Sequence, residues 1–309
     1  MKSNLQTVFL WLSVLFCCCN YSFAQSSFFN PSDTCNTQRV KLVAYSTAGI
    51  YIAGMTGLYQ IWYKDYDLIH FHFFDDYNEW YQYDKLGHVG SSYYLSRWGM
   101  GLYRWTGIKR KKAIWIGGTV GLGFMTTIEI FDGFSAEWGF SISDIAANTL
   151  GTAMAISQQL MWDEQRISFK YSFLPSDYAR YRPDLFGKTF PEKLVKDYNG
   201  QTVWLSANIK SFIQKKDTRF PAWLNVAVGY GIEGLTGARF NPESFNGKPI
   251  PPFERYRQFY LAPDIDFSKI RTEKKGLKFL FSILGFIKIP APAIEFNRVN
   301  KIKFHALHF

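Results

Sequence analysis

The sequence predicts an α+β protein in which a membrane-associating four-helix bundle precedes a β-rich C-terminal region. Three observations lead to this prediction. Four long apolar segments, rich in small residues, fill the first half of the chain, and each is near the length that a bilayer requires. The second half alternates apolar and polar residues over short segments, which is typical of half-buried strands. Aromatic residues make up 19% of the chain, and Trp and Tyr favour membrane–water interfaces.

The first residues indicate export. Lys2 precedes an apolar run, residues 8–19, of the length typical of a signal-peptide core. Ser22-Phe23-Ala24 then places small residues at the two positions that a signal peptidase reads, so we expect a signal peptide over residues 1–24. A buried N-terminal helix is the weaker alternative. Cleavage would leave Cys35 as the only cysteine, which excludes an internal disulfide framework.

Helices are expected in the region 25–165. The predicted segments cover residues 40–63, 84 to about 98, 113–131 and 143–162. Their closely spaced small residues would let helices approach tightly, as membrane helices do. Polar residues within them, such as Glu129, Asp144 and Gln158, make them mediocre membrane spans. A bundle that is amphipathic and partly embedded fits the pattern equally well.

The charges of the connecting loops indicate where the protein resides. The first and third loops are acidic and the second is basic. An exported N-terminus followed by four spans would place the basic loop outside, against the positive-inside rule. We therefore expect association with the outer membrane rather than four spans of the inner membrane. The net charge of +10 favours membrane lipid or lipopolysaccharide as partner, with no nucleic-acid motif, and the basic loop would supply Arg104, Lys109, Arg110, Lys111 and Lys112.

The region 166–309 is predicted to be a β-rich envelope domain. Strand candidates are residues 167–173, 202–212, 223–232, 259–267 and 302–309, whereas residues 274–288 suit either an interfacial helix or a buried strand. Five or six strands are too few for a complete membrane barrel, which needs about eight. His305 and His308 are three apart in a predicted strand, so we expect them on opposite faces.

A polar cluster is expected at one end of the bundle. Short connections make the helices alternate up and down, so one helix end and two helix starts should meet there. These ends carry seven polar residues: Asp84, Lys85, His88, Glu129, Asp132, Asp144 and Asn148.

Several roles are open for this cluster. His88, Asp84 and Glu129 could be catalytic acids or bases, and Lys85, Asp144 and Asn148 could bind a ligand. A divalent metal could instead be held by His88, Glu129 and Asp132. The structural alternative makes Asp84 an N-cap, Ser141 and Asp144 a capping box, and Lys85 an ion-pair partner of Glu129 or Asp132.

The cluster motifs resemble an uncharacterised bacterial family. Asp84-Lys85-Leu86-Gly87-His88, Glu129-x-x-Asp132-Gly133 and Asp144-Ile-x-x-Asn148-x-x-Gly151 are similar to the YfiM-like group of predicted periplasmic lipoproteins, with a distant likeness to VanZ-like membrane proteins. Motifs of the second half look like the longer version found in Bacteroidetes-type bacteria. The resemblance implies an envelope location and importance for the motif residues, but no reaction. The sequence departs from a lipoprotein at residue 16, where a Phe precedes the first possible acylated Cys.

The favoured function from sequence is a structural or assembly role in the outer envelope. It predicts a polar cluster that is wholly paired internally and faces no pocket. The alternative is an enzyme acting on an envelope lipid or cell-wall component, with a His/carboxylate site that opens into a cleft. A small transporter ranks third, because the polar residues gather at helix ends rather than along the helices.

Overall fold

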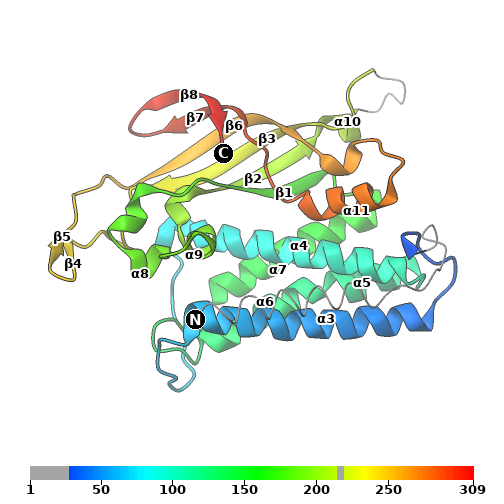
Figure 1. The fold of residues 1–309 in the computed structure, drawn as a ribbon, viewed down its shortest axis with the longest axis horizontal. Coiled ribbons are helices and arrows are strands. Elements are labelled where there is room, and N and C mark those ends of the chain that lie inside the picture. Colours follow the sequence, from blue (N-terminus) through cyan, green and yellow to red (C-terminus); the bar gives the residue numbers. More distant parts are fainter. Residues whose placement is uncertain (1–27, 214–218) are drawn as a thin grey trace, which may run out of the picture.

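Two layers make up the protein, a group of long helices and an antiparallel sheet lying over them (Figure 1). The computed structural model describes residues 28–213 and 219–309. The predicted α+β class is confirmed. The expected signal peptide, residues 1–24, lies outside the described residues.

The long helices follow the apolar segments closely. They are α3 (Thr37–Leu58, continued by a π-helical turn Tyr59–Tyr63), α4 (Tyr83–Trp105), α5 (Arg110–Gly118), α6 (Val120–Asp132) and α7 (Ile142–Trp162). Helix α4 packs against α5, α6 and α7, whereas α3 lies along the outside and, within the described residues, buries only Val43. A closed four-helix bundle is therefore not confirmed.

Glycines set the distance between these helices. A Cβ on Gly99 of α4 would lie 2.2 Å from the carbonyl oxygen of Gly117 in α5. One on Gly151 of α7 would lie 2.1 Å from the carbonyl oxygen of Val89. The backbones thus touch where the sequence places small residues, as expected for tight helix packing. Helices α5 and α6 together (Arg110–Asp132, mean hydropathy 1.4) are the one described segment whose length and composition would suit a membrane span, and 33% of its most apolar part is buried.

The sheet is a six-stranded antiparallel meander in the order β1-β2-β3-β6-β7-β8. This confirms the prediction of five or six strands without a complete barrel. Residues 275–284 form a helix, which settles the ambiguous segment. The strands are β1 (Ile167–Phe173), β2 (Gln201–Asn208), β3 (Leu224–Glu233), β6 (Tyr256–Ile265), β7 (Ala291–Asn297) and β8 (Lys301–His308). Short elements between them are α8 (Pro183–Phe186), α9 (Phe190–Lys196), α10 (Ile209–Phe212), α11 (Lys275–Leu284) and the hairpin β4–β5 (Ser244–Phe245, Lys248–Pro249).

One expectation about the last strand is wrong. The rings of His305 and His308 lie 5.1 Å apart, and both lie beside Tyr260. The pairing of β7 with β8 shifts register between Ala291 and Ala293. Such an irregularity adds a residue to one strand and breaks the period-two alternation, so residues three apart can share a face.

Strand β1 joins the two layers. Tyr94 of α4 donates hydrogen bonds to the carbonyl oxygens of Phe169 and Gly285, and Tyr93 donates to Ile167 over 3.2 Å. Phe169 fits against Gly90, where a Cβ would lie 3.0 Å from its ring. Buried aromatic residues with satisfied hydroxyl groups thus fix the sheet on helix α4.

The Gly99–Gly117 contact gives a test of the helical packing. We expect Gly99→Val to lower the free energy of unfolding by at least about 1–3 kcal/mol, because the added methyl groups would overlap backbone atoms of α5. Chemical denaturation followed by circular dichroism measures the change. Gly101→Ala is the matched control: no atom lies within 4 Å of a Cβ added there, so its stability should be equal to or slightly above that of the wild type. Equal stability of the Gly99→Val variant and the wild type would contradict the close packing.

Candidate functional site

Lys85 is buried at the start of α4 and is surrounded by carboxylates. Its Nζ lies 2.6 Å from Asp76 Oδ2, 2.8 Å from Asp144 Oδ1 and 3.2 Å from Asp84 Oδ2. Burial alone would lower the pKa of Lys85, but Asp84 and Asp144 outweigh it and raise the pKa above its usual value. The ammonium group is therefore charged and joins α4, α7 and the loop before α4. The expected pairing of Lys85 with Glu129 or Asp132 is wrong.

Asp76 is a member of the cluster that the sequence reasoning missed. It lies in the acidic, aromatic-rich loop between α3 and α4, and no local motif marks it. Its Oδ1 accepts hydrogen bonds from Ser141 Oγ (2.7 Å) and Ser143 Oγ (2.9 Å) at the start of α7. Burial opposes ionisation, but hydrogen bonds from Asp144 and Lys85 lower the pKa of Asp76 to about 2.

The capping expectations are partly confirmed. Ser141 is the N-cap of α7, and its side chain accepts a hydrogen bond from the Asp144 backbone N–H, as its spacing predicted. Asp84 is not an N-cap, because α4 begins one residue earlier and Gln82 occupies that position. The side chain of Asp84 is thereby left for Lys85 and for Tyr198, whose hydroxyl donates to Asp84 Oδ1 over 3.1 Å. Tyr198 comes from the C-terminal region and was also missed.

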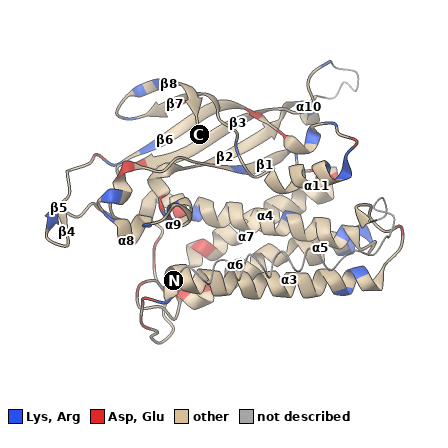
Figure 2. Ribbon diagram, in the orientation of Figure 1, with Lys and Arg blue, Asp and Glu red and all other residues tan. Residues whose placement is uncertain are grey.

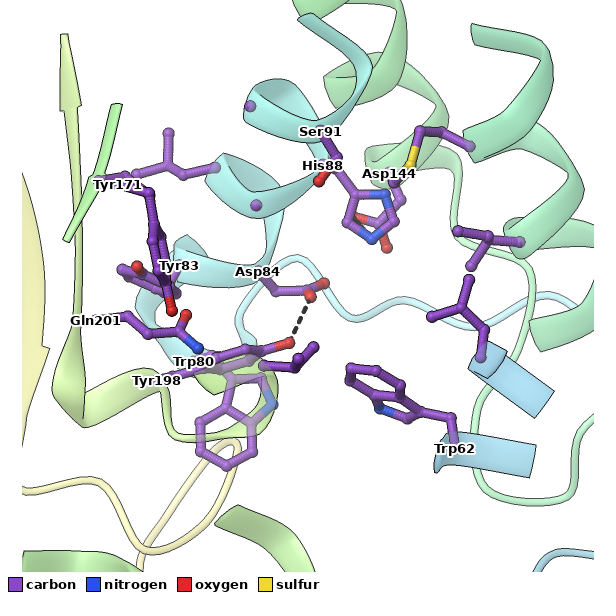
Figure 3. A pocket seen from close by; sticks show the side chains of 18 of the residues that line it. Trp62, Trp80, Tyr83, Asp84, His88, Ser91, Asp144, Tyr171, Tyr198 and Gln201 are labelled. Carbon is purple, nitrogen blue, oxygen red and sulfur yellow. Dashed lines mark hydrogen bonds and ion pairs between the residues drawn. The ribbon is translucent and has the colours of Figure 1, made fainter. Parts of the chain in front are cut away.

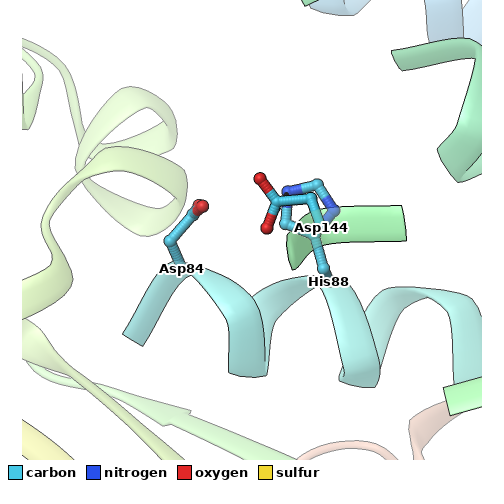
Figure 4. A group of neighbouring side chains, drawn as sticks. All are labelled: Asp84, His88 and Asp144. Atoms are coloured by element: carbon cyan, nitrogen blue, oxygen red, sulfur yellow. Dashed lines mark ion pairs between the residues drawn. The ribbon is translucent and has the colours of Figure 1, made fainter. Parts of the chain in front are cut away.

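His88 occupies the centre of the other half of the cluster. Its Nδ1 lies 3.1 Å from Asn148 Oδ1 and 3.5 Å from Glu129 Oε1, and its Nε2 lies 3.9 Å from Asp144 Oδ1. Figure 4 shows the imidazole of His88 beside Asp144, with Asp84 one helical turn away. Burial lowers the pKa of His88, but the charges of Asp84, Asp144 and Glu129 outweigh it, so the net shift is upward.

The acids around His88 hold protons near neutral pH. Burial raises the pKa of Glu129 to about 8 and the pKa of Asp132 to about 7. Burial and the charge of Asp84 raise the pKa of Asp144 to about 7. Asp132 lies to one side, where it accepts a 2.6 Å hydrogen bond from the hydroxyl of Tyr63. The cluster can therefore donate and accept protons at the pH of the envelope, which is the property that acid–base chemistry requires.

The geometry bears on the metal hypothesis. Among the described residues, the group that could hold a metal is Asp84, His88 and Asp144, whose ligand atoms all lie within 4.8 Å of one another. The predicted set of His88, Glu129 and Asp132 shares only the histidine with this group. Both aspartates already contact the Lys85 ammonium. Lys85 thus supplies the positive charge that a metal would otherwise provide.

The cluster forms one wall of a cavity of about 610 Å³ between the helices and the sheet. Asp84, His88, Asp144 and Ser91 line it (Figure 3). Asp132 lines it as well. Ser92 instead is buried and donates to the carbonyl oxygens of its own helix. Most of the remaining wall is aromatic or aliphatic, including Trp62, Trp80, Trp98, Tyr171, Phe169 and Phe286. A mostly apolar wall with a few convergent polar groups is the usual form of a small-molecule site.

A strained turn shapes the cavity edge. Trp80, Tyr81 and Gln82 adopt left-handed backbone angles, with φ of 48°, 50° and 62°. Non-glycine residues pay for this conformation, so it persists only where surrounding contacts enforce it, often at functional sites. Here the Trp80 N–H donates to the carbonyl oxygen of Ala238, and the Tyr230 hydroxyl donates to that of Tyr81. The turn places Trp80 against the cavity.

The predicted lipid-contacting residues lie at the opposite end of α4, where Figure 2 shows Lys and Arg near the start of α5. Arg104 and Arg110 share Asp163 as an ion-pair partner, at 2.9 and 3.0 Å, with side chains about half exposed. Lys109, Lys111 and Lys112 are exposed on or near the same turn. This basic end is separate from the acidic cluster.

The comparisons with known proteins agree with the motif resemblance. Residues 72–159 match the model of the family described as predicted periplasmic lipoprotein (DUF2279). No curated protein and no solved structure matches the chain. The matched segment runs from the loop that holds Asp76 through α7 and so contains His88, Lys85 and all the predicted cluster residues. An uncharacterised, exported envelope protein is consistent with this description. Residues 72–159 of this chain are thus similar to a family of predicted periplasmic lipoproteins of unknown function.

Proposed function

We propose that the protein resides at the outer membrane and binds an amphipathic envelope molecule, on whose polar end His88 and its neighbouring carboxylates perform acid–base chemistry. The observation that carries this proposal is the position of the cluster. Asp84, His88 and Asp144 line the 610 Å³ cavity instead of being sealed among themselves. An acid–base group that faces a largely apolar cavity suits a ligand with an apolar body and one polar end.

The charges of the cavity limit the polar end of the ligand. Five acidic residues line the cavity, Asp76, Glu79, Asp84, Asp132 and Asp144, and the buried Glu129 lies behind His88. The basic residues of the lining are His88 and Lys170, and Lys170 is already paired with Asp264. Protonation of the three acids with raised pKa values reduces the negative charge but adds no positive charge. A phosphate would meet like charge here, which costs free energy. A hydroxyl, amide or amino group would find hydrogen-bond acceptors and proton donors.

The residues divide into two tasks. Lys85, with Asp76 and Ser141, holds the wall in place. His88 would exchange a proton with the ligand. Glu129, which is buried behind it at 3.5 Å, would take up or return that proton, and Asn148 would orient the imidazole over 3.1 Å. Ser91, one turn after His88 on the same helix, adds an aliphatic hydroxyl group to the cavity wall. The basic end of α5 would contact anionic lipid or lipopolysaccharide and hold the protein at the membrane.

A structural or assembly role is the second candidate. One observation favours it: Lys85 and Asp76 connect a loop with the starts of α4 and α7, which is how a structural brace is built. This role predicts that filling the cavity has no effect on function. The transporter hypothesis gains no support, because the ionisable cluster lies at one end of the helices.

Filling the cavity tests ligand binding directly. Gly87 lines the cavity, and no atom lies within 4 Å of a Cβ built there, so Gly87→Phe should fill the space without breaking α4. We expect native mass spectrometry of the protein extracted in mild detergent to show a bound lipid-like molecule in the wild type and its loss in Gly87→Phe. Gly101→Phe, on the same helix but outside the cavity, is the matched control and should keep the ligand. His88→Gln should bind the ligand and fail to convert it.

Two results would contradict the proposal, one from this experiment and one from complementation. A wild-type protein that carries no ligand after extraction and after incubation with total envelope lipid would favour the brace. So would a Gly87→Phe protein that complements a deletion strain as well as the wild type does.

Protonation of the cluster predicts the pH dependence of stability. Glu129, Asp132 and Asp144 keep protons in the folded protein at pH values where the unfolded chain has lost them. The folded state therefore binds more protons between about pH 4 and 8, so stability falls as the pH rises through this window. His88 acts in the same direction, because its raised pKa gives stability that is lost at high pH. Asp76 acts oppositely, but only below about pH 4.

We expect the thermal unfolding midpoint to be several degrees higher at pH 5.5 than at pH 8.5. Glu129→Gln keeps the shape of the side chain and removes its titration, so the dependence should become shallower. Glu137→Gln, on the exposed surface after α6, is the control and should leave it unchanged. Stability that rises with pH in the wild type, or an unchanged slope in Glu129→Gln, would contradict the protonated cluster.

A further inference from the structure

The sheet exposes apolar residues on one face and buries charged residues on the other, which is the opposite of a sheet that packs on an apolar core. Residues opposite one another in antiparallel strands share a face. Following the pairing from β1 to β8 gives two complete apolar rows on one face: Phe169, Leu205, Val228, Leu261, Ile294 and Phe304, and then Tyr171, Val203, Tyr230, Phe259, Phe296 and Ile302. The helical layer covers these rows only near β1, β2 and the end of β3. Val228 is 54% exposed and Phe304 69% exposed.

The other face is buried and combines ion pairs with a small apolar cluster around Trp204 and Tyr260. Lys170 Nζ lies 2.7 Å from Asp264 Oδ2, and both side chains are at most 2% exposed. His305 Nε2 lies 2.6 Å from Glu295 Oε2, whose side chain is also 2% exposed. Burying ion pairs while leaving two apolar rows exposed is unfavourable in water, since burial of apolar surface is the main driving force of folding. It is the arrangement expected of a sheet whose outer face contacts hydrocarbon.

A basic pocket of about 400 Å³ lies at the end of these rows. Phe259 and Phe296 belong both to the second apolar row and to the pocket wall. The other lining residues include four cations, Arg255, Arg257, Arg298 and Lys301. The pocket is therefore basic, whereas the cavity on the other side of the turn at Tyr81 is acidic.

The positive charge of this pocket is largely unneutralised. Within residues 28–213 and 219–309, Arg255, Arg257 and Lys301 form no ion pair, and only Arg298 does, with the exposed Glu254 at 3.2 Å. The Nε and Nη1 atoms of Arg255 are buried and donate no hydrogen bond to any described residue. The guanidinium groups of Arg255 and Arg257 lie over the ring of Tyr81, at 5.2 and 4.3 Å. Guanidinium groups held in this way are suited to bind phosphate oxygens in pairs.

We propose that this pocket binds the phosphate headgroup of an anionic membrane lipid whose acyl chains lie along the exposed apolar rows of the sheet. The shared residues Phe259 and Phe296 place the headgroup site and the chain site side by side. The proposal does not depend on the acid–base cavity, which excludes phosphate by its charge.

Vesicle flotation tests this proposal. The mature protein is mixed with vesicles of phosphatidylcholine alone or of phosphatidylcholine with phosphatidylglycerol. We expect strong flotation with the anionic vesicles and weak flotation with the neutral ones. Arg257→Gln with Lys301→Gln should reduce the affinity for anionic vesicles about thirty-fold, since both residues are exposed and lie in the pocket. Ile302→Gln with Phe304→Gln should weaken binding to both kinds of vesicle.

Matched controls separate the pocket from net charge and from the cavity. Lys188→Gln with Lys248→Gln removes the same charge from two exposed sites outside the pocket and should float like the wild type. Gly87→Phe should also float like the wild type, so failure here and failure of the cavity proposal can be told apart. Circular dichroism confirms that each variant is folded.

Two results would overturn the proposal. One is equal flotation of the pocket variant and the charge-matched control. The other is a wild-type protein that does not bind vesicles but whose thermal unfolding midpoint rises with soluble glycerol phosphate. That result would make the pocket a site for a free phosphate ester.

Discussion

The burial of one ammonium group organises the functional half of this protein. Lys85 can be buried only because three carboxylates lie within 3.2 Å of it, and these carboxylates come from a loop, from α4 and from α7. Without these carboxylates the ammonium would be an unpaired charge in a desolvated place, which is strongly destabilising. The loop is therefore fixed against the helices, and with it the side of the cavity that Phe74 and Asp76 line. Because Lys85 is enclosed by the aspartates, His88 is the basic residue of the cluster that faces the cavity.

The turn at residues 80–82 separates two sites of opposite charge. Trp80 lines the acidic cavity and its neighbour Tyr81 lines the basic pocket. Both residues, and Gln82 after them, have left-handed backbone angles. Arg257 spans the division, donating to Gln82 Oε1 and to the Tyr230 hydroxyl while its guanidinium lies over Tyr81. The strain of the turn is thus offset by contacts from β3 and β6, so the sheet has to dock before either site is complete.

Local signals allowed the helices, the Ser141 cap and most strands to be predicted, because period and capping depend on neighbours in sequence. The meeting of His88 with Asp144 followed from helix alternation alone. Asp76 and Tyr198 could not be foreseen in the same way, since their positions depend on the path of a long loop and on how the sheet docks on α4. Lys85 was assigned the wrong partners for the same reason. Strand β7 was missed because its Ala-Pro start gives little β signal. The register shift that puts His305 and His308 on the same face could not be predicted either, because it depends on how β7 and β8 pair.

The apolar rows connect the acidic cavity, the basic pocket and the exposed outer face of the sheet. Their β1 and β2 members, Phe169, Tyr171 and Val203, form part of the cavity wall. Farther along, Phe259 and Phe296 border the basic pocket, and the rows end on β8, where Ile302 and Phe304 are the most exposed members. An acyl chain could therefore pass from the outer face of the sheet toward His88 along apolar side chains, without its hydrocarbon entering water. On this path the two proposed sites differ in charge: the pocket is basic and suits a phosphate, whereas the cavity is acidic and does not. The opposite charges of the two proposed sites would thus separate ligands by headgroup, and both sites depend on the sheet that follows the helical segment matched by the family model.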